Sequence, residues 1–346
     1  MNTSPQDNLA RYSRQMLVTQ IGEEGQRALL RSKALVLGVG ALGTALASGL
    51  VRAGVGDVRL VDRDFIELHN LQRQSLFDED DIAADLPKAV AAARKLRKIN
   101  RQFTVEPVVT DVTHRNVERL IEDRDVVLDG SDNFEVRMLL SEACAKHGVP
   151  WIYGAVIGTY GATLPILPED GPCFHALLPS LPAPGTVPSC DTAGVLGTVP
   201  PIIAALQVTE ALKILTGHRE ALCRELRYLD VWTGEVLRIE LAPLSSCAIC
   251  HEGQYDFLTG AHTSHAKRLC GDQAVQVRPQ GGPEDVDLEA LSRRLAPLGE
   301  MSANAYLLRF QVPPYEIVLF RDGRAIIRGT DDPGVARALY ARYIGL

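Results

Sequence analysis

A strand–turn–helix pattern between residues 33 and 54 constrains the fold of this chain more than any other feature. The letters KALVLGVG predict a short apolar strand that runs into a glycine turn, and ALGTALASGLVRAG predicts a helix of small residues after it. Gly38, Gly40 and Gly43 have the spacing G-x-G-x-x-G across this turn. That spacing between a strand and a helix is typical of nucleotide-binding α/β folds, because glycines let the backbone approach phosphates at the start of the helix.

Strands and helices alternate along the rest of the first 250 residues. Short apolar segments predict strands at 57–64, 103–109, 125–132, 149–158 and 160–168, and longer segments predict helices at 9–32, 86–100, 133–148 and 200–217. Pro87 suits the first turn of the helix that begins near residue 86. We expect an α/β fold with a doubly wound, mainly parallel sheet, Rossmann-like, and a small C-terminal α+β extension.

Two segments depart from this alternation. Residues 168–200 are rich in Pro, Gly and Ser and predict a long crossover loop, and loops of that length in compact domains are often functional. Beyond residue 255 the pattern predicts a small α+β unit with a hairpin turn at Asp322-Gly323. We therefore expect domains at residues 1–255 and 256–346.

Composition excludes several classes of protein. A net charge of −7 argues against nucleic-acid binding, which usually requires a basic surface. The chain has no apolar run of membrane-spanning length and no signal-peptide core at its start, so we expect a cytoplasmic protein that does not bind membranes. Its 7 cysteines are then thiols, metal ligands or nucleophiles rather than disulfide partners.

The glycine turn by itself leaves the ligand open. Asp62 lies at the end of the next predicted strand, where a carboxylate can accept hydrogen bonds from ribose hydroxyls. NAD and ATP both fit that arrangement, and a turn needed only for close packing of helix against strand fits the three glycines as well.

Polar side chains after the turn favour a triphosphate. Asn70, Arg73 and Gln74 lie in the segment VDRDFIELHNLQRQS, and Lys88 follows soon after. A triphosphate needs such cations, because displacement at phosphorus builds up charge on the leaving group, whereas the pyrophosphate of NAD binds largely through backbone. Asp132 lies at the end of a predicted strand and is a candidate ligand for Mg²⁺.

The order of these motifs resembles a known family. The segments RYSRQ, VLGVGALGT, LVDRDFIELHNLQRQ, PKAVAAA, LDGSDNFEVR, SCDTAG and SCAIC occur in family order over roughly residues 9–255. They are similar to those of the E1-like adenylyltransferases of the ThiF, MoeB and HesA group. The last ninety or so residues resemble the C-terminal extension of some thiazole-pathway ThiF enzymes.

This resemblance implies an activity. The substrate is a ubiquitin-like sulfur-carrier protein that ends in Gly-Gly, and its C-terminal carboxylate attacks the α-phosphate of ATP to give an acyl adenylate and pyrophosphate. A carboxylate is already ionised at pH 7, so no general base is required. The carrier belongs to thiamin, molybdopterin or tRNA-thiolation chemistry, with a sulfurtransferase as a further candidate partner.

The resemblance also assigns residues. Asp62 contacts the ribose, the phosphates are bound by Asn70, Arg73, Gln74 and Lys88, and Asp132 holds Mg²⁺. Arg14 matches an arginine that family members insert into the site of a partner subunit, which implies a homodimer. The remaining candidate nucleotide contacts are Gly38, Gly40, Gly43, Asp64 and Asn133.

The cysteines suggest two further hypotheses, a covalent role for one of them and a zinc site for three others. Family members have a cysteine at the position of Cys190 that takes up the acyl group or a persulfide, although some work by adenylation alone. Many relatives hold a zinc ion with two C-x-x-C pairs. Here Cys247 and Cys250 form the second pair, but Cys173 has Ala176 in place of its partner. Zinc therefore stays open, with His175 or His251 as a candidate fourth ligand.

Two other functions were considered. An NAD-dependent oxidoreductase would use the same glycine turn but gives Arg73, Gln74, Lys88 and the Cys247/Cys250 pair no role. A non-catalytic scaffold of the same fold would be expected to lose the phosphate-binding residues, which are all present here. We expect the final ninety residues to extend the surface for the dimer or the carrier.

Overall fold

The computed structural model describes residues 7–168, 170–182, 190–241, 247–261, 266–269, 273–278 and 286–345. The chain divides into two compact units, Met1–Ala261 and His262–Leu346. The assignment of folding domains at residue 255 stays a prediction.

The first unit is built on an 8-stranded sheet with the order β3-β2-β1-β4-β5-β6-β7-β8. The strands from β3 to β5 in this order are parallel, and β6, β7 and β8 continue the sheet in antiparallel pairs. Their bounds are β1 Lys33–Leu37, β2 Asp57–Asp62, β3 Thr104–Val109, β4 Val126–Asp129, β5 Trp151–Ile157, β6 Tyr160–Ile166, β7 Leu226–Asp230 and β8 Glu235–Ile239.

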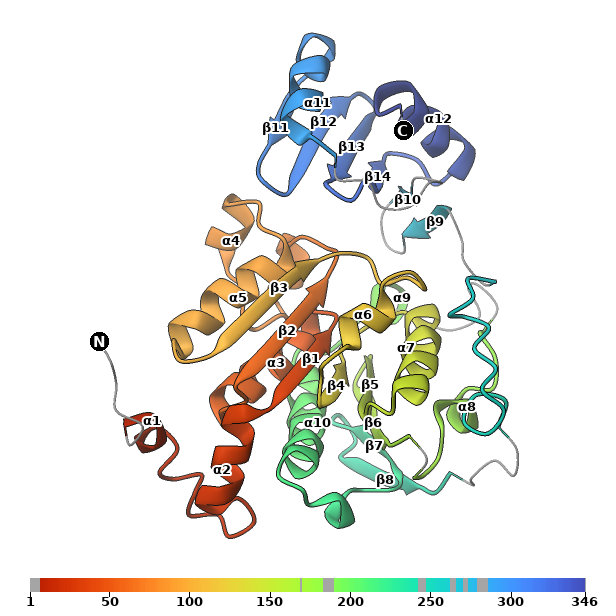
Figure 1. Ribbon diagram of the computed structural model, residues 1–346. Coiled ribbons are helices and arrows are strands. Elements are labelled where there is room, and N and C mark those ends of the chain that lie inside the picture. The colour runs from red at the N-terminus through yellow and green to blue at the C-terminus, as the bar shows by residue number, and fades with distance from the viewer. Residues whose placement is uncertain are drawn as a thin grey trace. The chain divides into compact units, whose positions relative to one another are not determined.

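Helices cover both faces of this sheet, which confirms the doubly wound fold (Figure 1). One face carries α3, α5 and α10, and α2 packs against α10, while α6 and α7 cover the other face. The central strands are buried on both faces, as the apolar letters of β1 and β4 predict. The helix bounds are α1 Asp7–Ala10, α2 Gly22–Arg31, α3 Ala41–Ala53, α4 Glu79–Ala83, α5 Lys88–Ile99, α6 Val117–Ile121, α7 Phe134–His147, α8 Phe174–Leu177, α9 Cys190–Ala193 and α10 Val199–Leu215.

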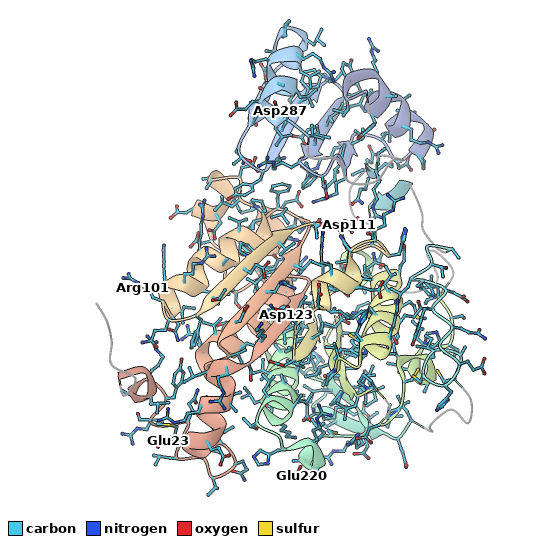
Figure 2. The ribbon with its side chains drawn as sticks, in the orientation of Figure 1. Glu23, Arg101, Asp111, Asp123, Glu220 and Asp287 are labelled. Carbon is cyan, nitrogen blue, oxygen red and sulfur yellow. The ribbon has the colours of Figure 1, made fainter. Side chains whose placement is uncertain are left out.

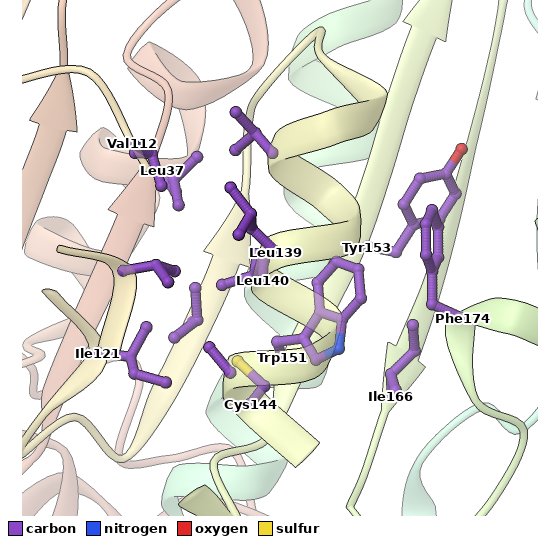
Figure 3. Packing of buried hydrophobic residues seen from close by; sticks show 14 of the residues in the cluster. Leu37, Val112, Ile121, Leu139, Leu140, Cys144, Trp151, Tyr153, Ile166 and Phe174 are labelled. Carbon is purple, nitrogen blue, oxygen red and sulfur yellow. The ribbon is translucent and has the colours of Figure 1, made fainter. Parts of the chain in front are cut away.

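The core on the α7 side is continuous from β1 to α8. Figure 3 shows Leu139, Leu140 and Cys144 of α7 with Leu37 and Ile121 on one side and the aromatic side chains of β5 and α8 on the other. There the ring of Phe174 lies 5.4 Å from the rings of both Trp151 and Tyr153. Because Phe174 is fully buried, this packing fixes α8 within the stretch 168–200, where we expected only a loop.

The expected helix over residues 9–32 is wrong in its centre. α1 ends at Ala10, turns follow, and α2 begins at Gly22, whose φ of +57° is left-handed. The physical reason is tertiary: the hydroxyl of buried Tyr12 accepts a hydrogen bond from Asn100, and Gln15 donates to the carbonyl of Ala53. These contacts hold the segment against the end of α3 and override its helical pattern.

The second unit contains a 6-stranded antiparallel sheet with the order β11-β12-β13-β14-β10-β9. Helices α11 and α12 pack on one face around a core that includes Phe310, Ile317 and Tyr340. The predicted hairpin turn is confirmed, because β13 pairs with β14 across Asp322-Gly323 and Gly323 has a φ of +79°. The bounds are β9 Ala266–Leu269, β10 Ala274–Val277, α11 Leu288–Leu295, β11 Met301–Ala303, β12 Leu307–Val312, β13 Tyr315–Phe320, β14 Ala325–Arg328 and α12 Pro333–Tyr343.

Within the described ranges, none of the helices combines the length and the apolar character that crossing a bilayer would require.

Candidate nucleotide site

The carboxyl ends of β2, β1 and β4 lie side by side at one edge of the first sheet. The chain proceeds from β1 to β2 and β3 on one side of β1, and places β4 and β5 on its other side. Strand order therefore reverses between β1 and β4, which is where open α/β sheets bind ligands.

The glycines at this edge are required by close backbone contacts. Gly38 has a φ of +84°, and a methyl group on it would lie 2.7 Å from the carbonyl oxygen of Gly130, just after β4. A methyl group on Gly43 would lie 1.8 Å from the carbonyl oxygen of Gly38. At Gly40 it would meet only Nε2 of Gln74, at 3.8 Å. Gly38 and Gly43 thus serve the fold, whereas Gly40 leaves open space over the turn.

Asp62 closes this turn from the end of β2. Its carboxylate accepts a hydrogen bond from the amide of Val39 at 2.6 Å and another from the amide of Asp64 at 2.7 Å. Burial raises the pKa of Asp62, although the nearby ammonium group of Lys88 acts in the opposite direction. A carboxylate held by two backbone amides is oriented before any ligand binds.

The short helix η1, Leu68–Asn70, positions the amide side chains of the candidate set. Asn70 is buried and its side-chain oxygen accepts from the amide of Glu67, which fixes the loop after β2. Gln74 is also buried, and within the described residues its Oε1 has no hydrogen-bond partner. Arg73 is half-buried and donates to the carbonyl of His69. Gln74 thus brings an amide with an unused acceptor against the glycine turn.

Lys88 is held at the same edge by the start of α5. An isolated bridge pairs Phe65 with Pro87, and the amide of Lys88 donates to the carbonyl of Asp64 at 2.8 Å. The Lys88 ammonium lies 3.5 Å from the Asp64 carboxylate. Burial would lower the pKa of Lys88, but the carboxylates of Asp64, Asp62 and Asp132 outweigh burial and raise it. The lysine therefore stays charged while buried.

Sequence reasoning missed Arg63 and Asp111. Arg63 lies between the two predicted acids, and its guanidinium is 3.4 Å from the carboxylates of both Asp64 and Asp111. Figure 2 shows Asp111 just past the end of β3. The sequence shows that Arg63 is charged, but it does not reveal that Arg63 pairs with a carboxylate 48 residues away.

Asp132 and Asn133 follow β4. Asp132 is exposed. Its carboxylate interacts electrostatically with Lys88 and Arg63 and helps to raise the pKa of both. Asn133 caps α7, because its side chain accepts from the amide of Glu135. The loop before them depends on a buried pair that the sequence analysis did not identify: Arg137 donates to Asp129 at 2.9 Å, and to the carbonyl of Ser131.

Two candidate residues are not brought into this cluster by the described structure. Arg14 is exposed in the turns between α1 and α2. Cys190 is the first residue of α9, and its side chain lies outside the described part of the chain.

The three cysteines of the zinc hypothesis lie together. The sulfur atoms of Cys173, Cys247 and Cys250 are within 4.8 Å of one another, and those of Cys173 and Cys247 are 3.4 Å apart. Cys173 precedes α8, and the other two lie in the turn after residue 246. The arrangement brings two segments more than 70 residues apart to one potential metal centre.

Solved structures share the fold of the first unit. A crystal structure described as E. coli MccB + ATP superimposes with a TM-score of 0.61 at 21% identity, covering 69% of this chain and 74% of that one. At this identity the likeness speaks to the fold alone.

Sequence relatives are much more similar. The "Sulfur carrier protein ThiS adenylyltransferase" of Bacillus subtilis is 44% identical over 339 residues, which covers 97% of this chain and 99% of that protein. The "SAMP-activating enzyme E1" of Haloferax volcanii is 40% identical over 248 residues, covering 72% and 91%. The description "ThiF family" matches residues 12–249, and the chain therefore belongs to the ThiF family.

Proposed function

We propose that this protein adenylates the C-terminal Gly-Gly carboxylate of a ubiquitin-like sulfur-carrier protein, with ATP as the donor. The observation that carries the proposal is the likeness over nearly the full length to a protein named for this activity on ThiS. The cluster of charged and amide side chains beside the glycine turn supports it. A non-catalytic scaffold would be expected to have lost those groups, whereas Asn70, Arg73, Gln74 and Lys88 are all present.

The reaction needs positioning and charge neutralisation rather than a base. The terminal carboxylate of the carrier is ionised at neutral pH and attacks the α-phosphorus of ATP, while the bond to the departing pyrophosphate breaks. Asp62, oriented by the amides of Val39 and Asp64, accepts from the ribose hydroxyls. Gln74 and Asn70 supply amide groups to the phosphates, and Gly40 lets the backbone approach them.

Charge balance explains why further cations are needed. Around Lys88 and Arg63 lie the carboxylates of Asp62, Asp64 and Asp132, and Asp111 pairs with Arg63, so that carboxylates outnumber cations. A triphosphate adds more negative charge. Arg73 at the turn, Arg14 from a second copy of the chain and Mg²⁺ would offset it in this proposal.

The exposed carboxylate of Asp132 suits Mg²⁺, since this ion prefers oxygen ligands and keeps several of its waters. Asp64, whose side chain is 43% exposed, is a further accessible carboxylate of the cluster. Bound Mg²⁺ would neutralise charge on the phosphate oxygens, while Lys88 acts from the buried side.

Coverage by the relatives favours a ThiS-type carrier. The B. subtilis protein matches 97% of this chain, whereas the H. volcanii protein matches 72%. We therefore associate the second unit with ThiS-type carriers, and propose that it extends the surface for the carrier or the dimer. Deletion of residues after about 270 should weaken carrier binding, and unchanged affinity with an intact dimer would contradict this role.

A separate sulfurtransferase is part of the proposal. Danio rerio "Adenylyltransferase and sulfurtransferase MOCS3" is 36% identical over 257 residues, and this chain spans 55% of that protein. A covalent role of Cys190 also stays a prediction. Mass spectrometry of enzyme, carrier and ATP without reductant should show a thiol-sensitive adduct at Cys190, and its absence would count against that role.

Exchange of labelled pyrophosphate into ATP, with a Gly-Gly-ending carrier present, tests the site. We expect Lys88→Ala and Arg73→Ala each to lower the exchange rate on the order of 10²-fold, by analogy with loss of one preorganised donor. Lys95→Ala is the matched control. It lies on the same helix, pairs with Asp78 and with Asp81 at 2.8 Å, and should leave exchange almost unchanged. Near-normal exchange in both site variants would refute the assignment.

A further inference from the structure

A buried ion pair lies directly beneath the loop that carries Asp132. Asp129 is the last residue of β4 and is fully buried, and Nε of Arg137 on α7 donates to its carboxylate at 2.9 Å. Arg137 is only 4% exposed. Burial alone would lower the pKa of Arg137, but the carboxylate of Asp129 outweighs burial and raises it. The guanidinium therefore stays charged in the interior.

The same two side chains fix the backbone between β4 and α7. Oδ1 of Asp129 accepts from the amide of Ser131 at 2.8 Å and from its hydroxyl at 2.6 Å. One terminal nitrogen of Arg137 donates to the carbonyl of Ser131 at 2.5 Å and to the carbonyl of Gly154 on β5 at 2.9 Å. Ser131 is thus held at its amide, its hydroxyl and its carbonyl, directly before Asp132.

Neighbouring elements hold this loop from two further sides. Nε2 of Gln207 on α10 donates at 3.0 Å to the carbonyl of Asp129 and, at the same distance, to the carbonyl of Ile152 on β5. On the glycine turn, a methyl group on Gly38 would lie 2.9 Å from the amide nitrogen of Ser131. The loop is therefore packed against the turn and cannot move closer to it without a backbone collision.

Asp132 depends on this loop for its position. Its carboxylate interacts electrostatically with Lys88, with Arg63 and with Arg137 itself. Within the described residues, however, its side chain makes no hydrogen bond or ion pair that would hold it in place. The backbone of the loop, and hence the ion pair beneath it, determines where this carboxylate lies.

We propose that Arg137, acting with Asp129, is a positioning residue of the nucleotide site, because the pair holds the loop so that Asp132 presents its carboxylate at the edge of the sheet. The inference rests on the proposed function and gives the pair a role beyond the stability of the fold. A carboxylate that binds Mg²⁺ must be placed accurately, since this ion demands near-ideal octahedral geometry. Outer groups that orient a metal ligand usually account for about 10- to 100-fold in metal affinity or activity.

A variant that keeps the fold but frees the loop separates the two roles. Asp129→Leu combined with Arg137→Met replaces the ion pair with apolar side chains, a change that often preserves stability. We expect this double variant to unfold cooperatively in urea, and to exchange the backbone amides of residues 130–133 with deuterium faster than the parent. Its KM for Mg²⁺-ATP in carrier-dependent pyrophosphate exchange should rise about 10- to 100-fold.

Two further variants narrow the cause. Ser131→Ala removes only the hydroxyl bond to Asp129 and should raise the same KM about fivefold, the equivalent of one net hydrogen bond. Arg124→Met is the matched control, because Arg124 pairs at 2.9 Å with Asp57 at the opposite, amino end of β2 and is equally buried from solvent at its side chain. It should lose stability and keep the KM of the parent.

Coupling to Asp132 identifies the route. In an Asp132→Ala background, the double substitution should change the exchange rate by less than about twofold, since the carboxylate that the pair positions is then absent. A full additional loss in that background would overturn the inference, because the pair would then act on the fold alone.

The remaining outcomes distinguish this inference from the proposed function. An unchanged KM for Mg²⁺-ATP in the double variant and in Ser131→Ala would overturn the inference and leave the proposed function intact. Deuterium exchange at 130–133 as slow in the double variant as in the parent would overturn it as well. Absence of carrier-dependent exchange in the parent would instead refute the proposed function, and the inference with it.

Discussion

Substitution of single glycines in the turn separates its role in the fold from its role in phosphate binding. A methyl group on Gly40 would contact only Nε2 of Gln74, at 3.8 Å, so alanine brings no steric clash there. We therefore expect Gly40→Ala to cost clearly less unfolding free energy than Gly43→Ala, whose methyl group would clash with backbone. If ATP binds as proposed, the same methyl group would stand between the backbone and the phosphates. If one backbone donor is lost, pyrophosphate exchange should fall by about 10²- to 10³-fold, or ~2.7–4 kcal/mol.

Gly43→Ala should behave in the opposite way. Its methyl group would lie 1.8 Å from the carbonyl oxygen and 2.7 Å from the carbonyl carbon of Gly38. Gly38 cannot yield, because it packs against the backbone of Gly130. Overpacking in cores usually costs about 1–3 kcal/mol and occasionally more, and a backbone-to-backbone clash belongs at the upper end, at about 3 kcal/mol or above.

Two measurements on the same pair of variants separate the role of each glycine in the fold from its role in phosphate binding. Urea denaturation gives the free energy of unfolding, and exchange of labelled pyrophosphate in the presence of carrier gives nucleotide turnover. We expect Gly40→Ala to be more stable than Gly43→Ala and yet to be inactive in exchange. Full exchange by Gly40→Ala would refute the approach of phosphates to this turn, and a fully stable Gly43→Ala would refute the packing argument.

Two further predictions concern buried charge. Burial raises the pKa of Asp62 in the folded protein, so the folded state binds a proton there more tightly than the unfolded chain. The stability of the parent relative to Asp62→Asn should therefore fall as the pH rises from about 4 through the raised pKa. Denaturation of both proteins from pH 4 to 8 checks this, and a difference independent of pH would contradict it. Arg137→Met leaves the fully buried Asp129 without its ion-pair partner, and should cost about 3–5 kcal/mol of unfolding free energy. Adding Asp129→Leu should recover part of that loss, and simple additivity of the two changes would show that the pair is not coupled.

Local pattern was enough to predict the parallel part of the first sheet and the long helices beside it, but not β7 and β8. Apolar strands that end in glycine or acid, separated by helices, specify parallel pairing, and the strand ends then bring Gly38, Asp62 and Asp132 to one edge without further information. The antiparallel hairpin of the second unit also followed from local turn chemistry at Asp322-Gly323.

Contacts between distant residues set the limits of that prediction. The pairing of Arg63 with Asp111 and of Arg137 with Asp129 depends on the side chains that each strand end faces, which no local spacing reveals. The N-terminal segment has helical letters, yet Tyr12 and Gln15 bind Asn100 and Ala53 and hold it in turns. There, tertiary hydrogen bonds outweigh the weak helical preference of the segment.

Intact-mass spectrometry of the carrier gives the sharpest test of carrier adenylation by this protein. The protein is mixed with Mg²⁺, ATP and a ThiS-type carrier, and the mass of the carrier is followed together with pyrophosphate release. We expect an adenylyl group on the carrier C-terminus, formed with release of pyrophosphate and absent from a carrier without its final glycine. A carrier whose mass stays unchanged while the protein is folded and binds ATP would contradict it.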